Sequence, residues 1–415
     1  MRRIYRVIGL LLIGCSWTIM ASGQETLSIS APESLTCDLL TEITADYPEA
    51  SVRVDCVLPV EWDTQLLLDF VTGTGSDLVV LETQMLGMAV DGGHLLELTD
   101  WLDDVLPVDD YLPNVLDVYG AYPPASARYY ALPMMPDARV LAYRTDIFEQ
   151  AGYSVPMTWA ELLAQAGALR VGELIDYGFT THWRPVDELT ANAWNHLLWS
   201  YGGALWDAET LRVSGVLDTQ PARNALILAN QLRQTAPPNA GNFTPDDVRD
   251  TLCNGETAIV EIWASSALLL SDPATCPQAE MLAFALVPAG EVEHVISLGG
   301  TSVAVNANSA QLDSALDLLA WLQSDAVQAC WLAGGGLSAR QSVLSNESFA
   351  QGVPVARAYT EALPLGRDHW THPDHQILIA IQQNYLNLAI TGQLTIDEAL
   401  AIIAREQQII LDGRN

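Results

Sequence analysis

The order of predicted strands and helices near the N-terminal end is the feature that most constrains the fold. Apolar or alternating segments predict strands at residues 26–31, 51–58 and 78–81, and the segments between them predict helices that end near residues 47 and 72. A β-α-β-α-β order places parallel strands in one sheet with helices on its faces. We therefore predict an α/β fold whose ligands bind beyond the carboxyl ends of the strands.

Residues 131–166 have the pattern of a chain that leaves one sheet and enters another. An apolar run is interrupted by the polar residue Asp137 and continues as a strand-like run at residues 140–143. After a small-residue turn, Thr158 is the predicted N-cap of a helix, and Glu161 three residues later completes a capping box. The pattern indicates a strand, a polar crossing, a second strand and a capped helix.

The same stretch resembles a signature of the extracellular solute-binding proteins that serve ABC sugar importers, the maltose-binding protein group. The residues that carry this resemblance are Tyr143, Arg144, Asp146, Phe148, Ala151, Gly152, Pro156, Thr158 and Trp159. Arg144 is a departure, because the family usually has Asn at that position. Later segments resemble further family elements in the same order, at residues 76–80, 198–203, 254–259, 334–340 and 391–400, although Ser338 replaces the usual Pro.

The resemblance implies a two-lobed, periplasmic-binding-protein-like fold of type II, in which each lobe is a mainly parallel sheet flanked by helices. Lobe 1 would comprise residues 25–135 and 300–340, and lobe 2 residues 136–299 and 341–415. The chain would cross between the lobes at residues 134–138 and 296–308, and these crossings would act as hinges. The implied function is capture of a mono- or oligosaccharide in the cleft and its delivery to the permease subunits of an ABC transporter.

Charge excludes some partners. The chain has a formal net charge of −33, and all 18 of its basic residues are Arg. Such a charge repels nucleic acid and anionic membrane surfaces. We therefore expect a small-molecule ligand, no nucleic acid and, from the resemblance, a monomer without a cofactor.

The first 24 residues resemble an export signal. Arg2, Arg3 and Arg6 precede a short apolar run, and residues 12–15 then resemble a bacterial lipobox in which Cys15 would be lipidated. Ordinary cleavage near Gly23 is the alternative. The apolar run is too short for the roughly 20 residues that span a bilayer. We expect an exported protein that is periplasmic or held at the cell surface by a lipid anchor.

An oxidising compartment makes disulfides possible. Pairing by proximity in the sequence would join Cys37 to Cys56 and Cys253 to Cys276, although four cysteines allow three connectivities. Cys330 would then be a buried thiol. No Cys-x-x-Cys spacing is present, so the sequence gives no support for a zinc or redox motif.

Aromatic and polar residues at predicted element ends are the candidate ligand contacts. Aromatic faces stack on the C–H faces of sugar rings, and carboxylates accept hydrogen bonds from vicinal hydroxyls. The candidates are Trp62, Glu82, Gln84, Asp137, His182, Trp183, Trp194, Trp263, Gly300 and Trp370. The resemblance places Asp137 at the hinge carboxylate of maltose-binding proteins. Core packing remains the alternative for the tryptophans, and helix capping for Glu82 and Gln84.

Other classes of function have weaker support. His369, His372 and His375 could bind a transition metal, but Pro373 interrupts the helix that would align them. The alternative to sugar binding is thus a lipoprotein that binds a metal or another small solute. An extracellular carbohydrate-active enzyme is less favoured, because no catalytic motif is present and no pair of carboxylates is fixed by the sequence.

Overall fold

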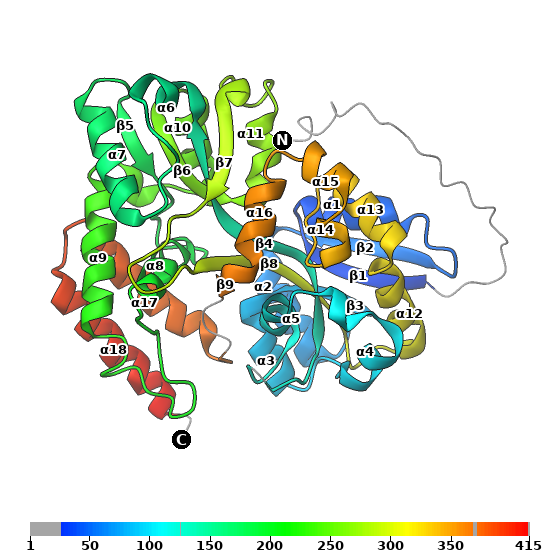
Figure 1. The fold of residues 1–415 in the computed structure, drawn as a ribbon. Coiled ribbons are helices and arrows are strands. Elements are labelled where there is room, and N and C mark those ends of the chain that lie inside the picture. Colours follow the sequence, from blue (N-terminus) through cyan, green and yellow to red (C-terminus); the bar gives the residue numbers. More distant parts are fainter. Residues whose placement is uncertain (1–25, 125, 368–371, 414–415) are drawn as a thin grey trace.

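A computed structural model describes residues 26–124, 126–367 and 372–413 of the chain. Figure 1 shows two α/β lobes joined by long strands that run between them. The strands are β1 (Thr26–Pro32), β2 (Ser51–Val57), β3 (Leu78–Glu82), β4 (Ala131–Arg144), β5 (Tyr177–Thr180), β6 (Thr257–Trp263), β7 (Leu282–Leu286), β8 (Ile296–Val305) and β9 (Gly366–Arg367). Their hydrogen-bonded order is β2-β1-β3-β8-β4-β6-β5, with β7 on β4 and β9 on β8.

Strand β4 belongs to both lobes. Its first part, residues 131–138, pairs with β8, and its second part, residues 139–144, pairs with β6 and β7. The change of partner falls beside Asp137, where the sequence predicted the polar crossing. Strand β8 is the second crossing, since it pairs with β3 and β4 at one end and with β9 at the other.

The sheets are mixed rather than mainly parallel. The predicted parallel order holds for β1, β2 and β3, and again for β5 and β6. However, β8 inserts antiparallel between β3 and β4, and β4 is antiparallel to β6 and β7. The physical reason is that a strand returning directly from the other lobe enters the sheet from the opposite end. The prediction of an α/β fold with two lobes is confirmed, and the detail of strand direction is corrected.

Lobe 1 carries helices on both faces of its sheet. They are α1 (Leu35–Thr44), α2 (Pro59–Thr72), η1 (Thr83–Met85), α3 (Leu86–Asp91), α4 (Thr99–Val105), η2 (Val108–Asp110), α5 (Pro113–Gly120), α12 (Leu312–Leu322) and α13 (Asp325–Ala333). In Figure 1, α14 (Gln341–Leu344) and α15 (Glu347–Gly352) lie beside α13, so the chain is still at lobe 1 after residue 340.

Lobe 2 contains the remaining helices. They are α6 (Thr145–Ala151), α7 (Trp159–Val171), α8 (Leu189–Ser200), α9 (Gln220–Arg233), η3 (Ala240–Asn242), α10 (Pro245–Cys253), η4 (Ala264–Ser266), α11 (Ala267–Ser271), η5 (Ala279–Met281), α17 (His375–Ile390) and α18 (Ile396–Asp412). Helix α16 (Ala356–Ala362), followed by η6 (Leu363–Leu365), packs against β4 and β7. The predicted capping box of Thr158 and Glu161 is present at α7.

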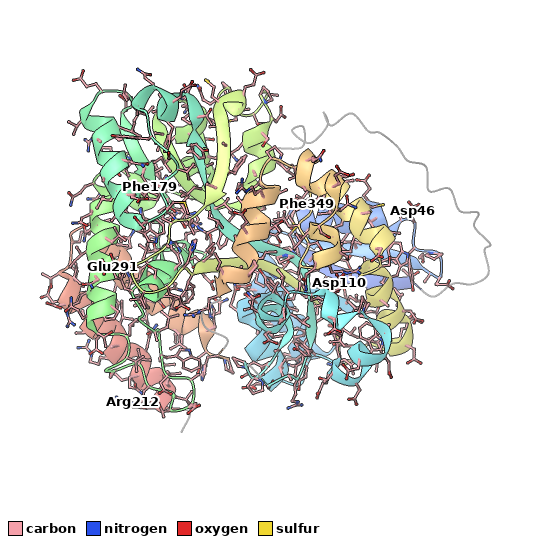
Figure 2. The ribbon with its side chains drawn as sticks, viewed as in Figure 1. Asp46, Asp110, Phe179, Arg212, Glu291 and Phe349 are labelled. Carbon is pink, nitrogen blue, oxygen red and sulfur yellow. A yellow bond between two sulfur atoms is a disulfide. The ribbon has the colours of Figure 1, made fainter. Side chains whose placement is uncertain are left out.

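Side chains fill the space between sheets and helices in both lobes (Figure 2). Phe179 of β5 and Phe349 of α15, both labelled there, are buried in the core. Every residue of α8 is buried, because β8, α9 and α17 surround this helix. None of the helices in the described residues is long and apolar enough to cross a bilayer.

Two disulfides tie local segments together. Cys37 of α1 is joined to Cys56 of β2, and Cys253 of α10 is joined to Cys276, as pairing by proximity predicted. Cys330 takes part in neither bridge and is exposed, so the prediction of a buried thiol is wrong. The reason is its position on α13, where the neighbouring Trp331 takes the inward position and is fully buried.

Candidate functional site

The crossing strands form the base of the candidate site. Asp137 of β4 lies opposite Gly299 of β8, and its Oδ1 accepts hydrogen bonds from the backbone N–H groups of Ala138 (2.8 Å) and Ser265 (3.2 Å). Burial raises the pKa of Asp137 to about 6, although the hydrogen bonds from Ser265 oppose that rise. Asp137 therefore presents a buried carboxyl group at the point where the two crossing strands meet.

Trp263, at the end of β6, lies against the same strands. Its ring is half-buried, and a Cβ added to Gly299 would approach Cη2 of the indole to 2.7 Å. Gly300 has φ +93°, and an added Cβ would lie 2.1 Å from the carbonyl oxygen of Met135. Only glycine fits these two positions without displacing a neighbour. The strands thus keep a flat backbone surface beneath the indole.

A buried charged network lies under Trp263. The guanidinium of Arg139 is 4.9 Å from the indole centroid, its Nε donates to Glu261 Oε1 at 2.7 Å, and another nitrogen donates to Thr181 Oγ1 at 2.6 Å. Arg139 also donates to a ring nitrogen of His182. Burial, followed by the charge of Arg139, holds the pKa of His182 well below its ordinary value, so the imidazole is a neutral acceptor.

Lobe 1 contributes the end of β3 to one wall. Glu82 accepts a hydrogen bond from the side-chain amide of Gln84, which is 9% exposed. The Glu82 side chain is exposed to solvent, but protein atoms surround it on several sides, as in a cleft. Burial, followed by the charges of Glu188 and Asp63, raises the pKa of Glu82 to about 8.

Residues from both lobes surround Glu82. Asp63 comes from α2 of lobe 1, whereas Glu188 precedes α8 of lobe 2 and hydrogen bonds His375 at the start of α17. Gln376 donates to Asp63 Oδ2 at 3.3 Å and so bridges the lobes. Burial and the charge of Glu188 raise the pKa of Asp63. The site therefore has a rim of carboxylates that the two lobes share.

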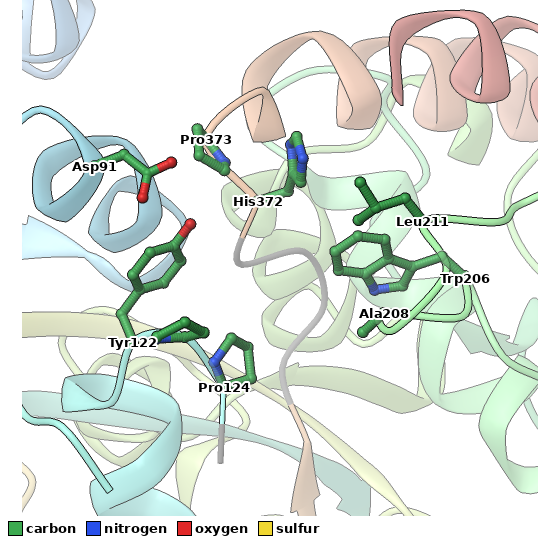
Figure 3. Close-up of a pocket in the computed structure, with 9 residues that line it drawn as sticks. Asp91, Tyr122, Pro124, Trp206, Ala208, Leu211, His372 and Pro373 are labelled. Atoms are coloured by element: carbon green, nitrogen blue, oxygen red, sulfur yellow. The ribbon is translucent and has the colours of Figure 1, made fainter. Parts of the chain in front are cut away.

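A cavity of about 290 Å³ opens between the lobes (Figure 3). In Figure 3, Asp91, Tyr122 and Pro124 form its lobe 1 side, and Trp206, Ala208 and Leu211 form its lobe 2 side. His372 and Pro373 lie between these sides and precede the start of α17 by a few residues. His372, a candidate metal ligand in the sequence, lines this cavity, whereas none of the predicted sugar contacts among the described residues does. Its lining shares no residue with the site at the crossing strands described above.

Several predicted contacts lie in the core instead. Trp183 and Trp194 are 1% and 0% exposed, so neither ring offers a face to a ligand, contrary to the expectation of stacking. Trp194 is buried because it lies on α8, and every residue of that helix is buried. His182 is 1% exposed and already bound to Arg139, and Trp62 is 3% exposed in a lobe 1 cluster with Leu66 and Phe70. Trp370 and Cys15 lie outside the described residues.

The site also contains residues that sequence reasoning missed. Asp63, Glu188, Arg139, Glu261 and Gly299 all belong to it, but none was a candidate. Asp63 follows Trp62 at the carboxyl end of a predicted strand, where ligands of such sheets bind, but only Trp62 was taken as a contact. Arg139 and Glu261 lie within apolar strands, and only the pairing of β4 with β6 brings them together. Among the described residues, no group of three or more His, Cys, Asp or Glu is arranged to hold a metal ion.

The chain is similar in sequence to a known protein family. A model of the family "Bacterial extracellular solute-binding protein" matches residues 39–329. The chain belongs to this family. Members are solute-binding proteins rather than enzymes, and the extracellular family is exported.

Several similar proteins and solved structures are named as binding proteins. A mannitol-binding protein of Pseudomonas aeruginosa is 24% identical over 92% of both chains, and a probable ABC transporter-binding protein of Deinococcus radiodurans is 27% identical over 64% of this chain and 63% of its own. The match to putative binding proteins of Brucella spans 61% of their length.

Among solved structures, maltose-bound MalE3 of T. maritima has a TM-score of 0.80 at 22% identity, covering 93% of this chain and 99% of its own. A ribitol complex from Agrobacterium radiobacter has a TM-score of 0.79 at 25% identity, covering 93% and 98%.

Proposed function

We propose that this solute-binding protein captures a sugar or polyol between its lobes and delivers it to the permease of an ABC importer. One observation carries the proposal: groups from lobe 1, lobe 2 and the strands between them converge on one cleft. Glu82 and Asp63 line one side, Glu188 the other, and Asp137 and Trp263 the base. Carboxylates accept bonds from hydroxyls, while the indole offers an apolar face to ring carbons.

The names of similar proteins support this ligand class. The Pseudomonas relative is named for mannitol, and the structural neighbours hold maltose and ribitol. Hydroxyl-rich neutral ligands are common to all three. The chemistry of the base, with the Asp137 carboxyl group and the half-buried indole of Trp263, suits the same class.

We also propose how the chain is divided between the two lobes. Lobe 1 would be residues 25–135 and 300–352 and lobe 2 residues 136–299 and 353–415, hinged where β4 and β8 cross; the return to lobe 2 thus comes after α15 and not at the sequence-predicted residue 341. Ligand would favour the closed arrangement because it contacts both lobes there, and differential affinity is what shifts such an equilibrium. We also propose that a lipid on Cys15 holds the monomer at the membrane near its permease.

Thermal unfolding against sugars, polyols, amines and metal ions tests the function. A sugar or polyol should raise the melting temperature by mass action and remain chemically unaltered. Trp263→Ala and Asp137→Ala should abolish this shift. Trp321→Ala is a matched control, because Trp321 is also partly buried but packs on Tyr47, away from the cleft. If no sugar or polyol shifts the unmodified protein, the proposed ligand class is wrong.

A further inference from the structure

The carboxylates of the cleft come from separate elements that face one another. Glu82 ends β3 and Asp63 lies on α2, both in lobe 1, while Asp187 and Glu188 precede α8 in lobe 2. Asp187 and Glu188 both raise the pKa of Glu82 and of Asp63, so their negative charges act across the cleft. When the lobes approach, like charges are brought together, and closing costs free energy unless a positive charge enters between them.

The protein places little positive charge next to Glu82 and Asp63. Within the ranges that the structure describes, no Arg or His forms an ion pair with Glu82 or Asp63, and their side-chain donors are the neutral amides of Gln84 and Gln376. His375 lowers the pKa of Asp63, but it is hydrogen bonded to Glu188. Arg139 is buried and bound to Glu261. The chain contains no Lys to take this role.

A buried polar atom beside Glu82 points independently to a bound molecule. Thr301 of β8 is opposite Glu82 in the antiparallel pairing of β3 with β8, so the two side chains lie on the same face of the sheet. Thr301 is 9% exposed, and its hydroxyl has no hydrogen-bond partner among the described residues. Buried polar groups are rarely left unpaired, so this hydroxyl favours a bound ligand that carries a polar group.

We propose that the ligand carries a positively charged amino group beside its hydroxyls, as in an amino sugar or an amino polyol. The ammonium group lies between Glu82 and Asp63, and the hydroxyls contact the base of the cleft near Asp137 and Trp263. This inference rests on the proposed function and narrows its ligand class. The cation removes the repulsion between the lobes, so that charge as well as shape selects the ligand.

Matched ligand pairs test the charge requirement. Binding to the protein from residue 25 onward is measured calorimetrically at about 0.15 M salt, where nonspecific surface attraction is screened. The pairs are glucosamine with glucose and N-acetylglucosamine, and glucamine with sorbitol, together with putrescine as a plain diamine. We expect the charged member of a pair to bind at least about tenfold more tightly than its neutral partners.

Variants locate the charge and exclude a general electrostatic effect. Glu82→Gln and Asp63→Asn should each weaken binding of the amine by about tenfold or more, and should weaken it more than they weaken binding of its neutral partner. Glu61→Gln is the matched control, because Glu61 is an exposed carboxylate on the same helix as Asp63. Binding of the amine near pH 7 should also release protons from Glu82, since a cation favours the ionised carboxylate. Proton release is read from the binding enthalpy in two buffers.

The outcomes separate this inference from the proposed function. Neutral sugars that bind as tightly as their amines, with no effect of Glu82→Gln, overturn the charge requirement and leave sugar binding intact. Binding of putrescine alone supports the cation site and contradicts the sugar ligand. If no compound of any class binds, the proposed function fails, and the inference fails with it.

Discussion

At the scale of single residues, Glu82 shows how a cleft changes the chemistry of an ordinary carboxyl. Water reaches the side chain, but the surrounding protein and nearby carboxylates disfavour its charge and raise its pKa to about 8. A folded-state pKa above the unfolded value means that the folded protein binds more protons between these values. Glu82 therefore makes the folded protein less stable relative to the unfolded chain as pH rises from about 4.5 to about 8.

Glu82→Gln should remove the loss of folding stability that Glu82 causes as pH rises. At pH 8 the variant should be more stable than the unmodified protein by about 1 kcal/mol, a value kept small because water screens the exposed side chain. At pH 4.5 the two should be equal in stability. Denaturant unfolding at both pH values measures the difference, with Glu61→Gln reporting the general effect of removing one negative charge. Equal stability of Glu82→Gln and the unmodified protein at pH 8 would contradict the raised pKa.

The buried pair of Arg139 and Glu261 leads to a second prediction at this scale. Glu261→Ala should destabilise the protein by about 3–5 kcal/mol, because it leaves the guanidinium buried without its partner charge. The double change Arg139→Met with Glu261→Leu should cost less than Glu261→Ala alone, since it removes both charges and keeps the volume. Urea unfolding of the three proteins checks the order. A double variant less stable than Glu261→Ala would show that the network contributes more than charge pairing.

At the scale of elements, β8 is constrained by what packs on its backbone. Gly300→Ala should destabilise more than Gly299→Ala, because its Cβ meets a backbone carbonyl at positive φ, whereas that of Gly299 meets a side chain. We expect about 2–4 kcal/mol for Gly300→Ala and about 1–3 for Gly299→Ala. Gly167→Ala, inside α7 with no atom within 4 Å of the new Cβ, should instead stabilise by about 0.5–1 kcal/mol. Thermal unfolding compares them, and equal effects at the two β8 positions would be inconsistent with this packing.

Elements also show what the sequence can predict. The capping boxes at Thr158 and Thr395 were predictable, because a cap depends on residues three apart in the chain. Helix α8 was not. Its Asn195 and His196 look like a solvated face, but Asn195 accepts a hydrogen bond from Gln382 of α17, and His196 lies 3.5 Å from Glu261 of β6. These partners are distant in the sequence, so burial of Trp194 follows from the tertiary fold alone.

At the scale of the whole molecule, each disulfide belongs to one lobe. Cys37–Cys56 closes a 19-residue separation in lobe 1, and Cys253–Cys276 a 23-residue separation in lobe 2. Replacing both cysteines of either pair by Ser should cost about 2–4 kcal/mol. Hydrogen exchange should show the faster opening mainly in the lobe that lost its bridge. Cys330→Ser, at an exposed position outside both bridges, should change stability by less than about 0.5 kcal/mol. Equal exchange in both lobes would show that they unfold as one unit.

The position of β8 also governs how the protein can be made. Because β8 lies between β3 and β4, the sheet of lobe 1 stays open until residues 296–305 have left the ribosome. At about 5–20 residues per second, synthesis from residue 144 to residue 296 takes on the order of ten seconds. Throughout this interval the edges of β3 and β4 are unpaired and could join another chain. The acidic residues are spread along the chain and give the finished protein a net charge of −33, so copies repel one another and such pairing is opposed.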